Sequence, residues 1–471
     1  MNNLSHTAAI ILAAGKGKRI GSHLPKVLYP LAGRPMVSYV LDTLISIGLK
    51  DIFVVTGFRS EDVQASINRR AYFVYQPTPL GTGHAVSCAL KEIPPDIDTI
   101  IVTNGDDSSF YTPQTFEKII ASHKASNSVI SIVTAEVDSP GGLGRIIRNE
   151  TNEVVAIREE KEATDLERNV KEVNIGLYVF DADWVRLALS KIEPRPGQEI
   201  YLVDVIAMAS AQQKKVNDIQ LGETSEWRGV NTQEELEIAN KQMVNKINSQ
   251  SESGKVYIFD LDDTLLATDK LKEIIEEKAV HMLKNVFSTT LDDVRIKTLF
   301  WDTYAIHKNK NGWISMPELG EELAQAFKIE DGGPIFKRLL YTLPFEDFIK
   351  PGAREILTQI SSLGKRVILA YGDLVYQPIK LSIFNNFIDT YQTYEKLTPT
   401  AISEIIELYD NSQIILIDDK LQNLADFKKS KDGVTTVWIK DGPYKNDLVP
   451  GFTPDYAVNN LAELTELIKR I

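Results

Sequence analysis

Short apolar runs alternate with helical patterns along the first half of the chain. Residues 8–14, 51–56 and 99–103 are mainly apolar runs of strand length, and the first ends in glycine-rich sequence, which is typical of a buried strand that passes into a loop. Residues 36–47 lie between the first two runs and carry apolar side chains at helical spacing. Alternating strands and helices predict an α/β fold with a mainly parallel sheet, and this pattern continues to about residue 240.

A new α/β pattern begins after a polar segment in the middle of the chain. Residues 248–254 are small and polar, which is typical of a linker. Strand patterns return at 256–259, 366–370 and 413–417. Between about residues 267 and 348 strand patterns are absent and helical patterns predominate, so we expect a helical insertion after the first of these strands.

These patterns predict two domains. We expect a first domain at 1–240, a linker at 241–254 and a second domain at 255–471, with a helical cap over about residues 267–348. The length of 471 residues supports this division, because it exceeds what a single hydrophobic core usually holds. Trp301, Tyr304 and Trp313 are expected to form the core of the helical cap.

Charge and cysteine content narrow the classes of partner. The formal net charge of −13 argues against non-specific binding of nucleic acid. Cys88 is the single cysteine, which excludes an intramolecular disulfide. The apolar run at 8–14 is too short to cross a membrane and has no basic flank ahead of it. We therefore expect a soluble cytoplasmic protein with neither a nucleic-acid nor a membrane partner.

The glycine-rich turn after the first apolar run is a candidate for phosphate chemistry. Gly15 and Gly17 allow backbone N–H groups to approach phosphate oxygens closely. Arg19 and Lys26 supply positive charge for a triphosphate. Taken alone, however, such a turn is a weak signal, because an ordinary tight turn has the same sequence.

Further segments along the chain match one family in order. The resemblance is to the nucleotidyltransferases, specifically the uridylyltransferase half of bacterial N-acetylglucosamine-1-phosphate uridylyltransferases, and it covers roughly the first 235 residues. It implies a Rossmann-like domain that transfers UMP from UTP to a sugar 1-phosphate, expected to be N-acetylglucosamine 1-phosphate, with release of pyrophosphate. The matching segments are 12–19, 25–28, 33–36, Gln76 with 80–85, 104–106, 144–146, 159–163, 173–176 and 229–232.

The resemblance also implies roles for individual residues. Arg19 and Lys26 would hold the phosphates, and Asp106 and Asn231 would bind Mg²⁺, a hard cation that prefers such oxygen ligands. In-line attack on the α-phosphorus needs no covalent intermediate, so positioning and charge neutralisation would carry the catalysis. The nucleotide would contact Ala14, Gly15, Gly17, Gln76, Gly81 and Thr82, and the sugar would contact Gly144, Glu159 and Asn174.

Three positions on the sugar side depart from the family pattern. Asp107-Ser108 stands where a residue followed by proline is usual, Leu143 replaces a tyrosine and Ile175 replaces a threonine. The sugar therefore stays open, with glucosamine, glucose or another hexose 1-phosphate as alternatives, and CTP or dTTP are alternatives to UTP. No hexapeptide repeat follows residue 240, so the acetyl transfer of bifunctional relatives is not expected.

A second candidate site begins with the run Phe-Asp-Leu-Asp-Asp-Thr at 259–264. Carboxylates at the carboxyl end of a strand lie where α/β proteins bind ligands, and here the first can attack phosphorus while the second moves a proton. Residues 255–465 resemble the haloacid dehalogenase superfamily of phosphohydrolases, which are Rossmannoid domains whose cap usually sets the choice of substrate.

This second resemblance implies a nucleophile, a proton carrier and a metal site. Asp260 would be the nucleophile and Asp262 the general acid and base, with an unknown phosphorylated compound as substrate. Lys396 is the best match to the lysine that holds the phosphate, and Lys380 is the alternative. The expected Mg²⁺ ligands are Asp260, Asp262 and Asp418.

One departure bears on whether this second domain is catalytic. The strand at 366–370 should end in serine or threonine, but Ala370 stands there. Loss of such a donor costs on the order of 10²-fold in rate, unless Tyr371 or the N–H of Gly372 replaces it. Two hypotheses follow: a bifunctional enzyme of nucleotide-sugar synthesis, and a nucleotidyltransferase whose second domain only binds, regulates or oligomerises.

Overall fold

The chain divides into two compact units, and each is described here by itself. The computed structural model describes residues 4–17, 20, 24–67, 70–194, 199–221, 226–250, 254–287, 289–311 and 314–471. The first unit holds residues up to Leu31 and Pro35–Ala239, and the second holds Ala32–Arg34 with Asn240–Ile471. Helix α8 (Gln233–Gln250) crosses this boundary, so residues 241–250 of the expected linker are helical.

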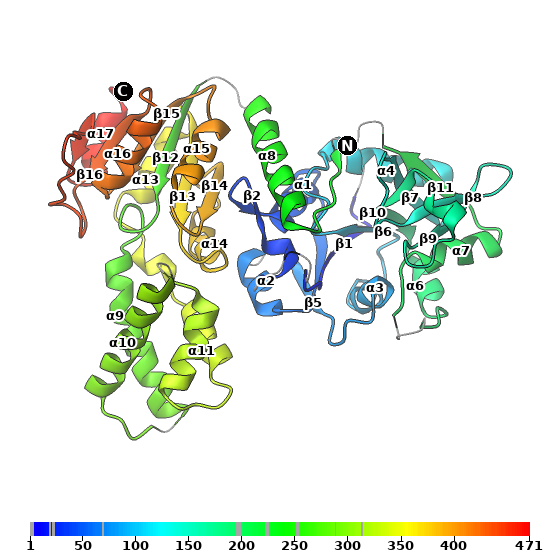
Figure 1. Cartoon of the computed structure of the whole chain (residues 1–471), viewed down its shortest axis with the longest axis horizontal. Helices are drawn as coiled ribbons and strands as arrows, with labels where there is room; N and C mark the ends of the chain where they lie inside the picture. The colour runs from blue at the N-terminus through cyan, green and yellow to red at the C-terminus, as the bar shows by residue number, and fades with distance from the viewer. Residues whose placement is uncertain are drawn as a thin grey trace. The chain divides into compact units, whose positions relative to one another are not determined.

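The first unit is built on a single sheet, which contains nine strands in the part of the chain that the structure describes. Their spatial order is β11-β7-β10-β6-β1-β4-β5, with β8 and β9 attached beside β10 (Figure 1). The bounds are β1 (Thr7–Ala13), β4 (Asp51–Thr56), β5 (Tyr72–Tyr75), β6 (Thr99–Asn104), β7 (Ile130–Glu136), β8 (Arg145–Arg148), β9 (Val154–Arg158), β10 (Glu172–Asp181) and β11 (Val216–Gln220); a short pair, β2 (Pro30–Leu31) and β3 (Arg34–Pro35), stands separately.

The α/β class is confirmed, but this sheet is mixed. β1 runs parallel to β4 and to β6, and β4 runs parallel to β5. β10, however, runs antiparallel to both of its long neighbours, β6 and β7, and also to β8. The apolar pattern predicted strands but carries no information on their direction, which explains the difference from a mainly parallel sheet.

Helices cover the sheet of the first unit and begin at residues suited to that position. Thr112 caps α4 with a reciprocal hydrogen-bonded box to Thr115, and Pro113 follows at the first helical position. Asp181 ends β10 and caps α6 by accepting a hydrogen bond from the N–H of Trp184. The helices are α1 (Met36–Ser46), α2 (Ser60–Ile67), α3 (Thr82–Leu90), α4 (Pro113–Ser126), α5 (Asp165–Arg168), α6 (Ala182–Leu189) and α7 (Asp204–Ala211), with the 3₁₀ turn η1 (Lys26–Leu28).

The second unit has an all-parallel sheet and a separate group of helices. Its six strands lie in the order β14-β13-β12-β15-β16-β17. Strand bounds are β12 (Lys255–Asp260), β13 (Lys365–Tyr371), β14 (Thr390–Tyr394), β15 (Gln413–Asp418), β16 (Thr435–Ile439) and β17 (Tyr456–Val458). The helices beside the sheet are α13 (Ala353–Ile360), α14 (Tyr376–Leu381), α15 (Pro399–Leu408), α16 (Leu421–Ser430) and α17 (Leu461–Ile468), with the 3₁₀ turn η5 (Ser382–Phe384).

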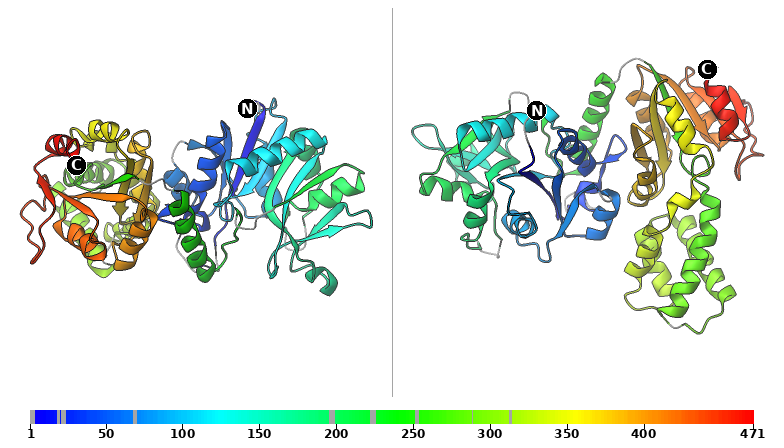
Figure 2. Two further views of the ribbon diagram at one scale, coloured as in Figure 1. Left: turned by 90° about the horizontal axis from the view of Figure 1, so that it is seen from above. Right: turned by 180° about the vertical axis from the view of Figure 1, so that it is seen from behind.

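The helices between β12 and β13 form a cap on this sheet. In Figure 1 the cap helices α9, α10 and α11 lie together beyond one end of the strands, and the view from behind in Figure 2 shows the same grouping. The cap consists of α9 (Thr268–Asn285), α10 (Asp293–Asn311), α11 (Met316–Ala326), α12 (Gly333–Tyr341) and the 3₁₀ turn η4 (Phe345–Phe348). Among the described residues, no helix is both long and apolar enough to cross a lipid bilayer.

Candidate active sites

The first candidate site lies where the chain changes direction across the sheet of the first unit. From β1 the chain adds β4 and β5 on one side, and it then crosses to place β6 on the other side of β1. The loops that follow β1 and β6 therefore diverge and leave a crevice at the carboxyl ends of the strands, where open α/β sheets bind ligands. The two loops stay tied at their base, since the N–H of Gly105 donates to the carbonyl of Leu12 over 2.9 Å.

Lys26 joins the two predicted metal ligands of this site. Its ammonium group donates to Asn231 Oδ1 over 3.0 Å and forms an ion pair with Asp106. All three side chains come from different segments, and Lys26 and Asn231 are 205 residues apart in the sequence. The lysine charge thus stands at the point where both oxygens converge, so the donor set suits a cation there. Arg19, the other predicted phosphate ligand, lies outside the described residues.

A pocket of about 540 Å³ lies beside this cluster. Gly17 has a left-handed φ of 61°, and a Cβ added there would meet the Lys26 Cβ at 2.9 Å, so only glycine lets the turn pass so close to the lysine. Four of the predicted nucleotide-binding residues line this pocket, namely Ala14, Gly15, Gly17 and Gln76.

Gly81 and Thr82, the other two predicted nucleotide-binding residues, hold this segment in place, and Gly81 contacts Gln76 directly. The Gln76 amide nitrogen donates to the carbonyl of Gly81 over 3.1 Å and lies 3.0 Å from His84 Nδ1. A carbonyl oxygen can only accept, so it fixes which end of the amide faces it. Within the described part of the chain, the contacts of the Gln76 amide are made by its nitrogen. Thr82 accepts a hydrogen bond from the Leu202 N–H over 3.0 Å, which ties this segment to the rest of the fold.

The three predicted sugar-binding residues lie close together: Gly144 directly precedes β8, Glu159 directly follows β9, and Asn174 lies on β10. The N–H of Asn174 donates to the carbonyl of Gly144 over 2.8 Å, and a Cβ on Gly144 would lie 3.5 Å from Glu159 Oε1. Asn174 also exchanges hydrogen bonds with the hydroxyl of Tyr178. This group borders the first cluster, because the adjacent Gly176 packs so tightly on Asn104 that an added Cβ would lie 2.2 Å from the Asn104 amide nitrogen.

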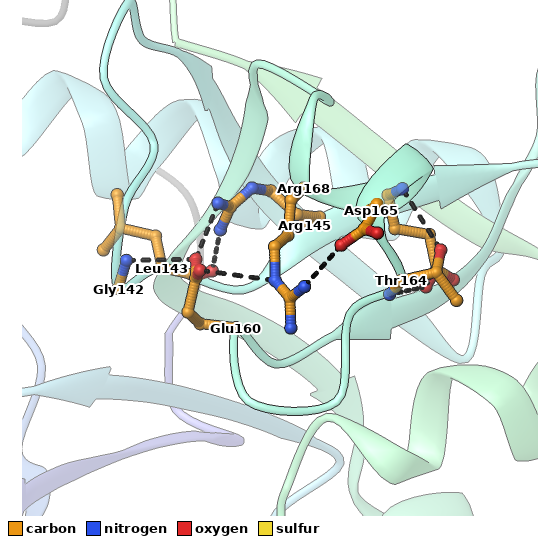
Figure 3. Close-up of polar contacts among 8 residues, drawn as sticks. Gly142, Leu143, Arg145, Glu160, Thr164, Asp165 and Arg168 are labelled. Atoms are coloured by element: carbon orange, nitrogen blue, oxygen red, sulfur yellow. Dashed lines mark hydrogen bonds and ion pairs between the residues drawn. The ribbon is translucent and has the colours of Figure 1, made fainter.

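A network of ion pairs and hydrogen bonds links the segments next to Gly144 and Glu159 (Figure 3). Arg145 is 2% exposed, and it pairs with Glu160 over 2.7 Å. Glu160 also accepts from the N–H of Gly142 over 3.1 Å and lies 3.8 Å from the guanidinium of Arg168. Arg145 follows Gly144 and Glu160 follows Glu159, so this pair fixes both neighbouring sugar-binding residues. The sequence motifs contained both members but did not show that they pair.

The departures from the family pattern have structural partners. Asp107 is held by the Asn104 amide over 3.0 Å and by the Ser108 hydroxyl over 3.2 Å. Burial, and then the charge of Asp106, raise the pKa of Asp107 to about 7. Hydrogen bonds therefore shape the loop where proline is usual in the family. The Ile175 side chain is buried at 1% exposure, and its carbonyl accepts from the Tyr111 hydroxyl over 3.2 Å.

The second candidate site is a buried group of three carboxylates. Asp260 ends β12, Asp418 ends β15, the strand beside it, and Asp419 follows Asp418. Ligand atoms of all three lie within 4.8 Å of one another, and each residue is 1% exposed. One oxygen of Asp260 and both oxygens of Asp419 find no hydrogen-bond partner within the described part of the chain. Buried, unpaired carboxylate oxygens are costly unless a cation meets them, so this group fits a metal ion.

Burial and mutual repulsion disfavour ionisation of the three carboxyl groups in this cluster. Burial, and then the neighbouring Asp418, raise the pKa of Asp419 to about 7 and that of Asp260 well above its ordinary value. Burial also raises the pKa of Asp418 to about 6. Asp419 completes this cluster, whereas the side chain of Asp262, a predicted metal ligand, is not part of it among the described residues.

Asp262 instead pairs with Lys380. The Lys380 ammonium contacts both carboxylate oxygens of Asp262, with Oδ2 at 2.6 Å, and the Thr268 hydroxyl donates to Oδ1 over 2.6 Å. Burial opposes ionisation of Asp262, but the lysine outweighs it and lowers the pKa of that carboxyl. Lys380 is 3% exposed, while Lys396 lines the same pocket from the loop after β14. Lys380, the alternative lysine, thus contacts Asp262 directly, and Lys396 lines the same pocket.

Tyr371 is the residue at the end of β13 that faces the pocket. Ala370 is buried at 1% exposure and does not line the pocket, whereas Tyr371 does. The Tyr371 hydroxyl accepts hydrogen bonds from Lys420 over 2.7 Å and from the Asn423 amide over 2.9 Å. Asn423 also donates to Asp418 over 2.8 Å, so Tyr371 is tied to the acidic cluster. Lys420 directly follows the acidic pair in the sequence and Asn423 comes three residues later, and this proximity is the signal that could have marked them.

Asp373 connects the cap to the core of the second unit. Its Oδ1 atom accepts from the N–H groups of Val375 and Tyr376, both over 2.8 Å, at the start of α14. Its Oδ2 atom accepts from the N–H of Met316 over 2.8 Å, at the start of α11 in the cap. The helix that carries Lys380 and a helix of the cap are therefore held by one carboxylate.

Both units have the construction of enzymes that act on phosphate groups: loops at the carboxyl ends of strands, converging oxygen ligands and lysines beside them. Comparison with family models gives the same result. Residues 8–246 match the model of nucleotidyl transferases, and residues 255–428 match that of haloacid dehalogenase-like hydrolases. The chain belongs to the nucleotidyl transferase family, and its second unit contains a haloacid dehalogenase-like hydrolase domain. Both resemblances seen in the sequence are thereby confirmed.

Curated relatives match the first part of the chain. The bifunctional protein GlmU of Oceanobacillus iheyensis is 37% identical over 267 residues, which cover 56% of this chain and 58% of that protein. GlmU of Caldanaerobacter subterraneus is 36% identical over 264 residues, which cover 56% of this chain and 57% of that protein. The chain thus spans less than two thirds of the length of these relatives. A putative glucose-1-phosphate thymidylyltransferase from Bacillus anthracis, solved with sucrose, is 19% identical, covers 50% of this chain and 95% of its own, and has a TM-score of 0.42.

Proposed function

We propose that the chain is a bifunctional enzyme of nucleotide-sugar synthesis. The first unit transfers UMP from UTP to N-acetylglucosamine 1-phosphate and releases pyrophosphate. The second unit hydrolyses a phosphate monoester through an aspartyl phosphate. The observation that carries the first activity is the convergence of Lys26, Asp106 and Asn231 beside the pocket of Gln76. The observation that carries the second is the buried cluster of Asp260, Asp418 and Asp419.

The transfer in the first unit rests on positioning. An oxygen of the sugar 1-phosphate attacks the α-phosphorus of the nucleotide in line, and the bond to the leaving pyrophosphate breaks. The Lys26 ammonium binds the phosphate oxygens on which negative charge develops. The oxygens of Asp106 and Asn231 would hold Mg²⁺ in the first unit, and the carboxylates of Asp260, Asp418 and Asp419 would hold it in the second. At either site the ion would neutralise phosphate charge and orient the phosphoryl group.

Gln76 supports a base that carries a ring N–H. Its amide nitrogen is engaged by the Gly81 carbonyl, so Oε1 is the atom presented to the pocket. Uracil has a donor at ring position N3, whereas cytosine has an acceptor there. A carbonyl oxygen binds the former and is left unpaired by the latter, which favours UTP over CTP. Thymine shares the N3 donor, so dTTP is the competing nucleotide that an experiment must include.

The test of the first activity is pyrophosphate release by the purified protein with Mg²⁺ and UTP. We expect release only when N-acetylglucosamine 1-phosphate is present, and more with UTP than with CTP. Parallel assays with dTTP, and with glucose 1-phosphate and glucosamine 1-phosphate, resolve the base and the sugar. Absence of release with every sugar phosphate in this panel would contradict the proposed transfer.

Removal of Glu160 should weaken binding of the sugar phosphate without disturbing the nucleotide. The Glu160→Ala variant leaves the buried Arg145 guanidinium without its ionised partner, so the neighbouring Gly144 and Glu159 lose their fixed positions. We expect the KM for the sugar 1-phosphate to rise by about tenfold, equivalent to roughly 1.4 kcal/mol, with little change in the KM for UTP. Glu153→Ala is the matched control, because Glu153 is an exposed carboxylate on the same β8–β9 hairpin. Equal effects of both variants would contradict this role.

Catalysis in the second unit uses both aspartates of its first motif. The Asp260 carboxylate attacks the phosphorus of the monoester, the bond to the alcohol oxygen breaks, and Asp262 donates a proton to that oxygen. A water molecule then attacks the phosphorus of the aspartyl phosphate, Asp262 takes a proton from it, and inorganic phosphate leaves with Asp260 restored. The Tyr371 hydroxyl accepts two hydrogen bonds and keeps its own hydrogen to donate, so it can replace the missing serine or threonine at a phosphoryl oxygen.

Lys380 links the arrival of substrate to the protonation of Asp262. In the resting protein the lysine lowers the pKa of that carboxyl, so Asp262 is ionised near neutral pH. A bound phosphate dianion gives Lys380 a second anionic partner and weakens its hold on Asp262. The pKa of Asp262 then rises, and the carboxyl takes up the proton that the leaving alcohol needs.

Stability of the second unit should depend on pH and metal together. The folded-state pKa values of Asp418 and Asp419, about 6 and about 7, lie above those of an unfolded chain. Their ionisation is thus disfavoured by folding, so the metal-free unit loses stability as pH rises from about 4 to 7. We expect Mg²⁺ to raise Tm by at least about 4 °C at pH 8 and much less at pH 5, because the cation binds ionised carboxylates.

Thermal unfolding with and without EDTA at both pH values measures this dependence. The Asp419→Asn variant is the control, since it removes one of the repelling charges while keeping the size of the side chain. It should flatten the pH dependence of the metal-free protein and reduce the Mg²⁺ effect at pH 8. An equal rise of Tm at pH 5 and pH 8 in the unmodified protein would show that the cation binds elsewhere.

A further inference from the structure

The pocket of the second unit has one polar wall and one apolar wall. It encloses about 390 Å³, which is within the range of sites for small molecules. The wall from the core contains the charged groups around the catalytic motif: Asp262, Lys380, Lys396 and Lys420, with Asp373 and Glu395. The wall from the cap contains many apolar and aromatic side chains, among them Phe300, Trp301 and Tyr304, together with the polar Thr268, Lys272 and Lys308.

The aromatic part of the cap wall consists of the buried Phe300 and the partly buried Trp301 and Tyr304. Trp301 and Tyr304 contact each other edge to face, with ring centroids 5.1 Å apart, and Phe300 packs on Trp301 in the same way at 5.2 Å. The indole N–H of Trp301 donates to Glu276 over 2.7 Å, which leaves no polar group of that ring for a ligand. Trp301 and Tyr304, expected as cap core, are partly buried and also line the pocket, while Trp313 lies outside the described residues.

This aromatic wall begins next to the proton carrier. Burial, and then the Asp262 charge, raise the pKa of Tyr376, and burial raises the pKa of Tyr304, where the Asp262 charge contributes as well. Tyr304 comes from the cap helix α10, and Tyr376 comes from α14 in the core. Since Asp262 protonates the leaving oxygen, the group attached to that oxygen lies between these two tyrosines and the apolar cap wall.

We propose that the second unit acts on the phosphate monoester of an alcohol with a flat aromatic ring, and not on a hexose phosphate. This inference rests on the proposed phosphatase function and names its class of substrate. A hexose would place several hydroxyl groups against the apolar part of the cap wall around Trp301 and Tyr304, where side chains cannot replace the hydrogen bonds lost from water. An aromatic ring is favoured there both by burial of apolar surface and by edge-to-face contacts with Trp301 and Tyr304.

Benzyl phosphate and glucose 6-phosphate form a matched pair of probes, because both release a primary alcohol of similar acidity. We expect kcat/KM for benzyl phosphate to exceed that for glucose 6-phosphate by about tenfold or more, the size of the combined burial and ring-contact effects. Calorimetric titration of the Asp260→Asn variant, which cannot form the aspartyl phosphate, measures the binding of the same two compounds without turnover. We expect the same preference in the dissociation constants.

Variants of the cap wall test whether the aromatic ring is what the pocket recognises. Tyr304→Ala should weaken binding of benzyl phosphate by about fivefold to tenfold and leave binding of inorganic phosphate unchanged, whereas Tyr304→Phe should retain full affinity because it keeps the ring. Ile306→Ala is the control on the same helix, since Ile306 is 66% exposed and does not line the pocket.

The two measurements separate the class of substrate from the activity. Glucose 6-phosphate that binds as tightly as benzyl phosphate, or a Tyr304→Ala variant with unchanged affinity, would overturn the aromatic class whether or not phosphate is released. Preferential binding of benzyl phosphate without phosphate release from any monoester would uphold the aromatic pocket and overturn the phosphatase.

Discussion

Replacing Asp260 with asparagine should abolish phosphate release by the second unit. The change keeps the shape of the side chain but removes the nucleophilic oxygen, and no other carboxylate of the cluster lies on the strand end that precedes Asp262. Loss of a covalent nucleophile costs on the order of 10⁴-fold or more in kcat. Phosphate release from benzyl phosphate measures the effect, and pyrophosphate release by the first unit in the same preparation shows that the protein is intact.

The control for this variant is Asp410→Asn, an exposed carboxylate that pairs with Lys431 on the surface of the same unit. It should keep the activity of the unmodified protein. If Asp260→Asn retained phosphate release at the original rate, the second unit would have no catalytic role for this residue, and a purely binding function would be favoured. The variant therefore decides between the two hypotheses that the sequence left open.

Replacing Asp106 with asparagine should remove most of the nucleotidyl transfer by the first unit. Asparagine keeps an oxygen ligand but loses the charge that balances Lys26 and attracts a divalent cation. The electrostatic stabilisation at stake is several kcal/mol, which corresponds to a decrease in kcat/KM on the order of 10³-fold. We expect the concentration of Mg²⁺ needed for half-maximal rate to rise at the same time, whereas the phosphatase rate should not change.

Pyrophosphate release at a series of Mg²⁺ concentrations measures both effects. Asp138→Asn is the matched control, because Asp138 is exposed on the same unit and pairs only with the exposed Lys171 among the contacts described. A loss of rate in Asp106→Asn with an unchanged Mg²⁺ requirement would contradict a metal-binding role, and would indicate that Asp106 acts only by holding Lys26.

The sequence predicted the positions of candidate site residues best where those residues lie at or near the end of a strand. Asp260, Asp106 and Asp418 each follow a run of apolar residues, so local pattern alone places them at strand ends. It predicted less where the partners are far apart in the chain. Lys26 and Asn231 are in contact although 205 residues separate them in the sequence. Their place in one site was predicted by the family resemblance, not by their spacing. The direction of β10 was not predictable either, because apolar alternation is the same in both directions.

The choice of the phosphate-holding lysine in the second unit shows a different limit of sequence-based prediction. Lys380 and Lys396 both line the pocket, and both follow β13 at distances from Asp260 that the sequence cannot rank. What separates them is the short helix α14, which turns Lys380 inward to Asp262. The end of β13 is a similar case: successive residues of a strand point to opposite faces, and Tyr371 lines the pocket whereas Ala370 does not.

The bonds that Asp373 makes at both ends have a kinetic consequence. One oxygen of this carboxylate caps the helix that carries Lys380, and the other holds the first residue of a cap helix. A movement of the cap would break the bond to Met316 or disturb the helix that carries Lys380, so under the proposed function we expect cap opening and phosphate release to be coupled. Such an event moves a helical body through solvent. The turnover rate of the second unit should then fall as glycerol or sucrose raises the viscosity, even for substrates whose chemical step is fast.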